Sequence, residues 1–121
     1  MTKKELMQLY YLNREIMNDT EELVELKIKQ RSGKPWNKDS EKLIKERERE
    51  LVLKIRHCTQ LKDKIDRFIN NIDDSFTRQI FYYRYVKCMP WRQVAYMTGA
   101  YCSEDCVRKI ADRYLRKCDK N

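Results

Sequence analysis

Hydrogen-bonding side chains are concentrated in the segment 103–117, whose sequence is SEDCVRKIADRYLRK. A helix over this segment would turn its charged side chains to one face and an apolar stripe to the other. The stripe consists of Val107, Ile110, Ala111, Tyr114 and Cys118. Guanidinium, ammonium and carboxylate groups on an exposed helical face can hydrogen-bond to base edges in the major groove of DNA. The residue types of this segment therefore indicate nucleic-acid recognition rather than catalysis.

A short helix and a tight turn are expected to position this segment. Pro90 is tolerated at the start of a helix, and Gly99 suits its end because glycine readily adopts a positive φ. Ala95 lies between them and is small enough for two helices to cross closely. Ser103 then provides an N-cap for the next helix. This spacing predicts a helix-turn-helix over residues 90–117.

The N-terminal part of the chain is expected to hold a long helix and a loop. Thr2 and Glu5 match a capping box, and the helix should end near Gln30. Its apolar residues repeat as a coiled-coil-like seam, formed by Leu9, Leu12, Ile16, Leu23 and Leu26. Residues 31–39 should form a loop. Its two helix breakers and its candidate aromatic anchor are Gly33, Pro35 and Trp36.

A second long helix is expected to begin at Ser40, which is a fair N-cap. Its seam is more regular and is formed by Leu51, Cys58, Leu61, Ile65, Phe68 and Ile72. A short loop makes two amphipathic helices antiparallel neighbours, so residues 1–72 should form an antiparallel, coiled-coil-like helical hairpin. One hairpin cannot bury both seams completely. This favours self-association, for example as a homodimer, or docking on the C-terminal domain.

Residues 73–121 are expected to form the second domain. The sequence Asp73-Asp74-Ser75 predicts a helix break followed by a cap. A helix over residues 75–87 would then bury Phe76, Ile80, Phe81 and Val86. The chain has two Gly and two Pro residues, too few for the turns of an all-β sandwich or barrel. The predicted fold class is all-α, with a helical hairpin followed by a helix-turn-helix domain.

The net charge of +8 is concentrated near the C-terminus. Residues 75–121 contain ten basic and four acidic residues, whereas residues 1–74 are nearly balanced. A basic domain beside neutral segments indicates a polyanionic partner, here double-stranded DNA, for the C-terminal domain. The longest run without a charge is eleven residues, which excludes a membrane-spanning helix. No signal-peptide apolar region follows Met1, so a cytoplasmic protein is expected.

The segment 103–117 resembles the recognition helix of the fourth conserved region of bacterial sigma factors. It shares with that helix a cap residue, polar reading positions, a β-branched core residue followed by Arg, and the ending Leu-Arg-Lys. The layout of residues 65–117 resembles more closely the phage-encoded regulators of the ArpU and RinA kind. Residues 80–85, with the Arg84-Tyr85 pair, and residues 90–95 share this likeness. The resemblance implies a sequence-specific transcription regulator of phage or mobile-element origin.

The resemblance and the predicted helices together select ten candidate DNA-binding residues. They are Arg92, Gln93, Tyr101, Ser103, Glu104, Asp105, Arg108, Lys109, Arg113 and Arg116. The resemblance implies promoter reading by Arg108 and Lys109. Glu104 and Asp105 could compensate the helix dipole or accept from cytosine N4. Two features depart from sigma factors, namely a longer turn over residues 99–103 and an acidic residue at position 104.

The aromatic residues of the C-terminal domain could stack on bases, but helix-spaced aromatics more often belong to a core. The residues concerned are Tyr82, Tyr83, Tyr85, Trp91, Tyr96 and Tyr114. We expect them mainly in the core, whereas Tyr101 lies in the predicted turn and is a candidate for a phosphate contact.

The sequence gives little support for an enzyme, a metal site or a cofactor. Five cysteines in a cytoplasmic protein are expected to be reduced thiols. Cys102 and Cys106 lie four residues apart, but zinc sites usually need two such pairs. The lone His57 lies within a charged helix, and no phosphate loop or nucleophile–base motif is present. We therefore expect neither catalysis nor a bound cofactor or metal.

Two other functions fit the same features. A phage small terminase-like subunit also joins a helix-turn-helix to an oligomerising helical segment, but it serves DNA packaging. A protein-binding module would contact RNA polymerase or a sigma factor and would not touch DNA. The oligomeric state would test the first alternative, and duplex binding at low salt would test the second.

Overall fold

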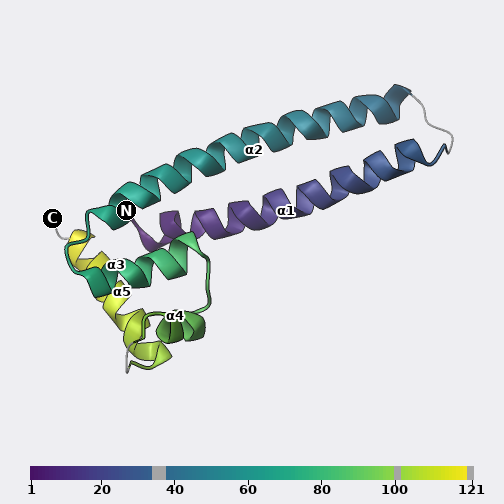
Figure 1. Cartoon of the computed structure of the whole chain (residues 1–121). Helices are drawn as coiled ribbons and strands as arrows, with labels where there is room; N and C mark the ends of the chain where they lie inside the picture. Colours follow the sequence, from purple (N-terminus) through teal and green to yellow (C-terminus); the bar gives the residue numbers. More distant parts are fainter. Residues whose placement is uncertain (34–37, 100–101, 120–121) are drawn as a thin grey trace. The chain divides into compact units, whose positions relative to one another are not determined.

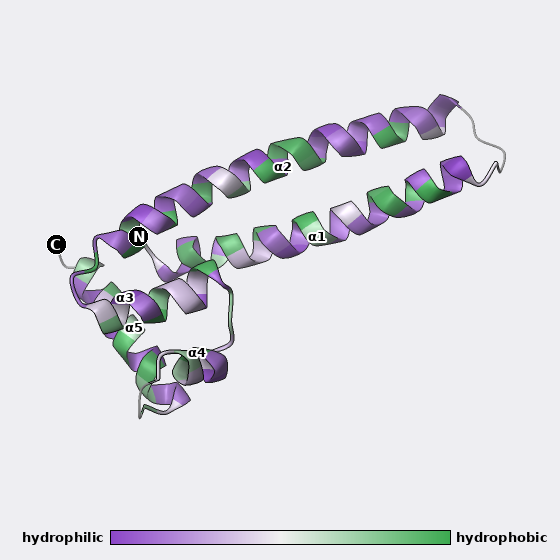
Figure 2. Cartoon of the chain, in the orientation of Figure 1, coloured by the Kyte–Doolittle hydropathy of each residue, from purple (hydrophilic) through white to green (hydrophobic). Residues whose placement is uncertain are grey.

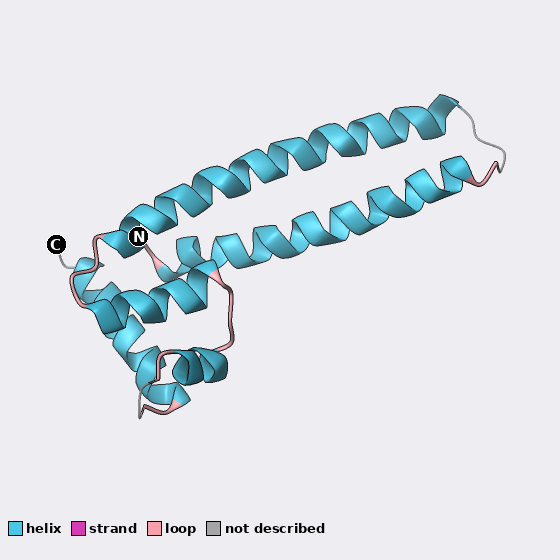
Figure 3. Cartoon of the chain, viewed as in Figure 1, coloured by secondary structure: helices cyan, strands magenta, loops and turns pink. Residues whose placement is uncertain are grey.

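The computed structural model describes residues 1–33, 38–99 and 102–119. All regular structure in these ranges is helical, and they contain no strand, which confirms the predicted all-α class (Figure 3). The helices, in chain order (Figure 1), are α1 (Lys3–Arg31), α2 (Lys38–Asn70), α3 (Ser75–Phe81), the π-helix η1 (Tyr82–Val86), α4 (Trp91–Met97) and α5 (Glu104–Asp119).

The chain divides into two compact units whose limits fall inside α1 and α2. The core unit comprises Met1–Tyr10 and Leu61–Asn121, and the two-helix unit comprises Tyr11–Gln60. The predicted limit between residues 72 and 73 therefore differs from this division. That limit, and the arrangement as a hairpin followed by a helix-turn-helix, stay predictions.

Ion pairs join α1 to α2 within the two-helix unit. Lys27 Nζ lies 2.9 Å from Glu48 Oε1, and Lys54 Nζ lies 2.8 Å from Glu15 Oε1. The residue numbers of the partners decrease along α1 as they increase along α2. The two segments are therefore antiparallel. Figure 2 shows hydrophobic and hydrophilic turns alternating along both helices. Among the described residues of this unit, the buried apolar side chains are Leu23 and Ile44.

The ends of the two long helices follow local signals with one exception. The backbone N–H of Glu5 donates to Thr2 Oγ1 at 3.2 Å, which confirms the predicted start of α1. Gly33 follows α1 with a φ of +71°. The predicted N-cap at Ser40 is wrong, because α2 begins at Lys38 and Ser40 lies within its first turn. Pro35 and Trp36 lie outside the described residues.

The core unit buries apolar side chains from every helix. Leu6 and Leu9 come from α1, and the set is completed by Ile65, Ile69, Ile72, Ile80, Phe81, Tyr85, Trp91, Val94, Val107, Ala111 and Leu115. Phe81 is at the centre of an aromatic cluster, with ring centroids 5.9 Å from Phe68 and 5.5 Å from both Tyr85 and Tyr114. Offset and edge-to-face pairs of this kind add stabilisation beyond area burial.

The segment after the predicted break at residues 73–75 begins as expected and ends differently. Asp74 caps α3, because its Oδ2 accepts from Thr77 N at 3.0 Å and from Thr77 Oγ1 at 2.7 Å. The helix continues beyond Phe81 as the π-helix η1, closed by the bond from Lys87 N to Tyr82 O. Tyr85 takes the buried position four residues after Phe81, whereas Val86 is only half-buried.

Candidate nucleic-acid interface

The helices α4 and α5 pack against each other and form the surroundings of the candidate site. Pro90 is the N-cap residue of α4, and Gly99 follows the helix with a φ of +64°. Within α4, the side chains of Trp91 and Val94 are buried, while that of Ala95 is half-buried. Pro90 and Gly99 therefore mark the start and the end of α4, as predicted.

The first turn of α5 is fixed by its cap. Ser103 Oγ accepts from Cys106 N at 3.2 Å, which confirms Ser103 as the N-cap. The face behind the cap is buried through Val107 and Ala111, as the apolar stripe predicts. Leu115 extends this buried face, and Ile110, Tyr114 and Cys118 are half-buried.

The opposite side of α5 carries the predicted charged residues. We define the α5 outer face as Glu104, Asp105, Arg108, Lys109, Arg113 and Arg116, all of which are exposed. A shallow hollow on this side is lined by Ser103, Asp105, Cys106, Lys109, Ile110 and Arg113. The helix thus holds its cations in a fixed order along about 24 Å, given its 16 residues.

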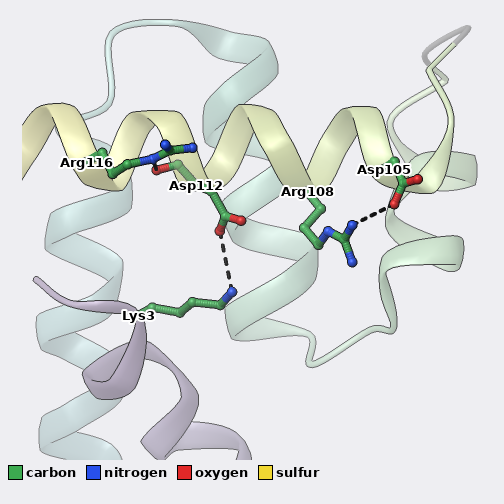
Figure 4. Close-up of polar contacts among 5 residues, drawn as sticks. All are labelled: Lys3, Asp105, Arg108, Asp112 and Arg116. Atoms are coloured by element: carbon green, nitrogen blue, oxygen red, sulfur yellow. Dashed lines mark hydrogen bonds and ion pairs between the residues drawn. The ribbon is translucent and has the colours of Figure 1, made fainter.

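Three polar contacts tie charged side chains of α5 to nearby groups (Figure 4). Arg108 Nη2 donates to Asp105 Oδ1 at 2.7 Å, within the first turns of the helix. Lys3 Nζ, from α1, lies 3.5 Å from Asp112 Oδ1. Arg116 Nε donates to the backbone oxygen of Asp112 at 3.5 Å. These pairs are solvent-exposed and individually weak, so an arriving phosphate can compete with the carboxylates.

Lys109 and Arg113 differ from these paired residues. Within the described ranges, neither side chain has an ion pair or hydrogen bond, and both line the hollow beside Ser103. Unpaired cations on a rigid helix need not give up a partner before they bind an anion. They can therefore contact an anion without breaking an existing pair on this surface.

The other candidates lie on or next to α4. Arg92 and Gln93 are exposed in the first turn of that helix. Tyr101 falls outside the described residues. Lys3 was not a sequence candidate, although it contacts Asp112, because the two residues are 109 positions apart and no local pattern links them.

The aromatic residues divide between core and surface. Tyr85 and Trp91 are buried, and Tyr114 belongs to the aromatic cluster, as expected for core residues. The expectation is wrong for Tyr96, which is 83% exposed, and for Tyr82, which is 38% exposed. α4 has two turns and buries one face through Trp91 and Val94, so Tyr96 is left on the outside.

Arg84 and Tyr85 make their contacts within the core unit and not on the α5 outer face. The Arg84 guanidinium lies 4.7 Å from the centre of the Trp91 ring, and its Nη1 donates to Met89 O at 3.0 Å. Burial raises the pKa of the Tyr85 hydroxyl to about 12, so this group is neutral at physiological pH. This pair connects η1 to the start of α4 and thereby supports the position of that helix.

The structure brings one pair of cysteines together. The sulfur atoms of Cys102 and Cys106 are adjacent, with Cα atoms 5.4 Å apart. Their spacing of four residues, across the cap of α5, brings the sulfur atoms together. Cys58, Cys88 and Cys118 are half-buried thiols.

The described part of the chain holds no group of three or more His, Cys, Asp or Glu side chains suited to a metal ion. None of its helices combines the length and apolar character needed to cross a membrane. Comparison with protein-family models, curated proteins and solved structures gives no match.

Proposed function

We propose that this chain is a sequence-specific, DNA-binding transcription regulator that inserts α5 into the major groove of double-stranded DNA. The observation that carries the proposal is the α5 outer face, a fixed row of hydrogen-bonding side chains that includes two unpaired cations. The opposite face of the same helix is buried against α3 and α4. An α-helix of this kind fits the width of the major groove.

The proposal treats α4, the turn at Gly99 and α5 as a helix-turn-helix. In this motif the N-terminal residues of the second helix contact base edges, and the first helix crosses the DNA backbone. Glu104, Asp105, Arg108 and Lys109 would then face bases. Residues further along α5 and at the start of α4 would contact phosphates; these are Arg113, Arg116, Arg92 and Gln93.

The distribution of charge supports this assignment. The core unit contains fifteen basic and nine acidic residues, whereas the two-helix unit contains twelve and ten. Most of the excess of positive charge therefore belongs to the unit that holds α5. Neutralising phosphates with these cations releases counterions and should make binding strongly salt-dependent.

The resemblance to sigma-factor region four and to ArpU- and RinA-like phage regulators adds a biological role to this chemistry. On that basis we propose a cytoplasmic regulator of phage or mobile-element transcription. Residues 1–72 would form the helical hairpin and residues 73–121 the helix-turn-helix domain. RNA polymerase would be a further partner of such a regulator.

The test is selection of bound duplexes from a random pool, followed by affinity measurements on the selected sequence. Lys109→Glu and Arg113→Glu should each weaken binding by about 1–3 kcal/mol, because a phosphate or base contact becomes repulsive. Lys29→Glu is the matched control, since Lys29 is an exposed cation of the two-helix unit. Equal losses in all three variants, or no binding at low salt, would contradict the proposal.

A protein-binding module is the second candidate, and the exposed apolar side chains of the two-helix unit favour it. They include Met17, Ile28, Val52 and Leu53. Capture of RNA polymerase or a sigma factor without any duplex binding would support this candidate. A large ring of subunits that binds DNA would instead support a terminase-like packaging subunit.

A further inference from the structure

The two-helix unit buries little apolar surface between its own helices. Among its described residues, only Leu23 and Ile44 are buried apolar side chains, while Leu12, Ile16, Leu26 and Leu51 are half-buried. Isolated helices depend on the packing of an apolar face for most of their stability. A pair of helices with so small a core gains stability when another surface covers its exposed apolar residues.

Three exposed apolar residues of α1 form one stripe. Met17, Val24 and Ile28 are between 50% and 63% exposed, and their spacing of seven and four residues places them on one helical face. At about 100° per residue, they lie about 100–140° around the helix from the seam residue Leu23. They therefore form a flank beside the seam.

On α2, the corresponding arc carries Val52 as its exposed apolar residue, with basic residues beside it. A shallow groove on this helix is lined by Lys45, Glu48, Arg49, Val52 and Leu53. At about 100° per residue, Val52, Lys45 and Arg49 lie about 100–160° from the seam residue Leu51, in the same rotational sense as the α1 stripe. Because the two helices are antiparallel, the α1 stripe and this arc of α2 lie on the same side of the unit. We call this side the flank surface.

Charges on the flank surface are separated by helix. Glu21 and Glu25 adjoin the apolar stripe of α1, whereas Lys45, Arg49 and Arg56 adjoin Val52 of α2. All five are exposed, and within the described ranges none of them has an ion pair. Some other charged residues of the unit pair between α1 and α2, as Lys27 does with Glu48. The middle of the flank surface thus presents acidic groups on α1 and basic groups on α2, whereas Arg14 and Arg31 add basic groups toward the two ends of the α1 stripe.

A surface of this kind is complementary to itself. A two-fold axis parallel to the helices would place α1 of one copy over α2 of the second copy, and the reverse. The ion pairs Asp19–Lys54 and Lys27–Glu48 show which residues of α1 and α2 lie level. At these levels, Glu21 would face the second copy between Arg49 and Arg56, and Glu25 would face it at the level of Arg49.

We propose that the chain forms a homodimer in which two flank surfaces pack face to face as a four-helix bundle. Met17, Val24 and Ile28 of α1, together with Val52 of α2, would form the apolar part of the interface. The acidic residues of α1 would pair with the basic residues of α2 of the second copy. The dimer does not depend on DNA binding. If the proposed function also holds, the dimer would present two copies of α5 to two half-sites.

The test is the mass of the full-length chain in solution, by light scattering and sedimentation, across a range of concentrations. We expect a dimer, and we expect Ile28→Asp and Val52→Asp to weaken it about tenfold or more, because each buries an unpaired charge in the apolar part of the interface. Leu43→Asp is the matched control, since Leu43 is exposed on the opposite flank of α2. Circular dichroism would verify that the variants remain helical.

A charge swap tests the pairing itself. Glu21→Arg and Arg49→Glu should each weaken the dimer, and the double variant should recover it because the pair is restored with reversed sign. A monomer at all concentrations would overturn the proposal. So would an assembly that withstands Ile28→Asp and Val52→Asp, or a double variant no better than its parents.

Discussion

The core unit and the two-helix unit are stabilised by different interactions. Of the fifteen buried apolar side chains in the described ranges, all but Leu23 and Ile44 belong to the core unit. The two-helix unit has instead a ladder of ion pairs between α1 and α2, including Lys54 with Glu15. Exposed ion pairs contribute little, whereas buried apolar side chains contribute most of folding stability. The comparison shows that helices of similar polarity can differ in how many apolar side chains they bury within their own unit.

The largest expected effect lies in the aromatic cluster of the core unit. Phe81→Ala should lower the free energy of unfolding by about 3–5 kcal/mol, because it leaves a cavity between Phe68, Tyr85 and Tyr114. Urea unfolding followed by circular dichroism measures this loss. Leu43→Ala, in the two-helix unit, is the control and should change stability by about 0.5 kcal/mol or less. Similar losses of unfolding free energy in both variants would contradict the proposed difference between the two units.

A smaller effect is expected at the cap of α3. The hydrogen bonds from the Thr77 hydroxyl and backbone lower the pKa of Asp74 below its ordinary value of 3.8. The folded state therefore binds this proton less readily than the unfolded state, so the stabilisation is complete above that value and is lost as the pH falls through the lowered pKa.

Thermal unfolding at decreasing pH tests this effect. Asp74→Asn keeps an acceptor but removes the titrating group, so the variant should lose less stability in acid than the wild type. Its loss at neutral pH should be smaller than that of Phe81→Ala. A wild type and a variant with parallel acid profiles would show that Asp74 does not contribute to the pH dependence.

The smallest effect is expected in the ion-pair ladder of the two-helix unit. Hydrogen bonds from Asp19 and Glu15 raise the pKa of Lys54, so its stabilisation is complete at neutral pH and is lost only in strong alkali. Because these side chains are partly exposed to solvent, Lys54→Gln should cost about 1 kcal/mol or less, and about 1 M salt should reduce the difference. Lys64→Gln, which breaks the pair with Glu5 in the core unit, is the matched comparison.

The helix ends could be predicted from the sequence because each end depends on a few neighbouring residues. Thr2, Asp74 and Ser103 cap helices as expected, and Gly99 ends α4. The start of α2 was misplaced by two residues, since Lys38 and Asp39 continue the helix beyond the expected cap.

Burial was predicted less completely because it depends on contacts between distant segments. The seam residues Ile65 and Ile72 are buried as expected, but Leu6 gave no comparable signal. For the candidate site, helical periodicity correctly placed the charged residues of α5 on an exposed face. It could not reveal the contact of Lys3 with Asp112, or which cations would be left unpaired.

The division of the chain also determines the order in which its parts can fold. Residues 1–10 form a core together with residues 61–121. The fifty residues of the two-helix unit lie between these two segments in the sequence. Closing a flexible loop of that length costs about 3–4 kcal/mol of chain entropy. Pairing of α1 with α2 shortens the loop before the core forms. Leu6 and Leu9 therefore leave the ribosome long before their neighbours in the core. The rate at which α1 pairs with α2 then determines how soon these two side chains are buried.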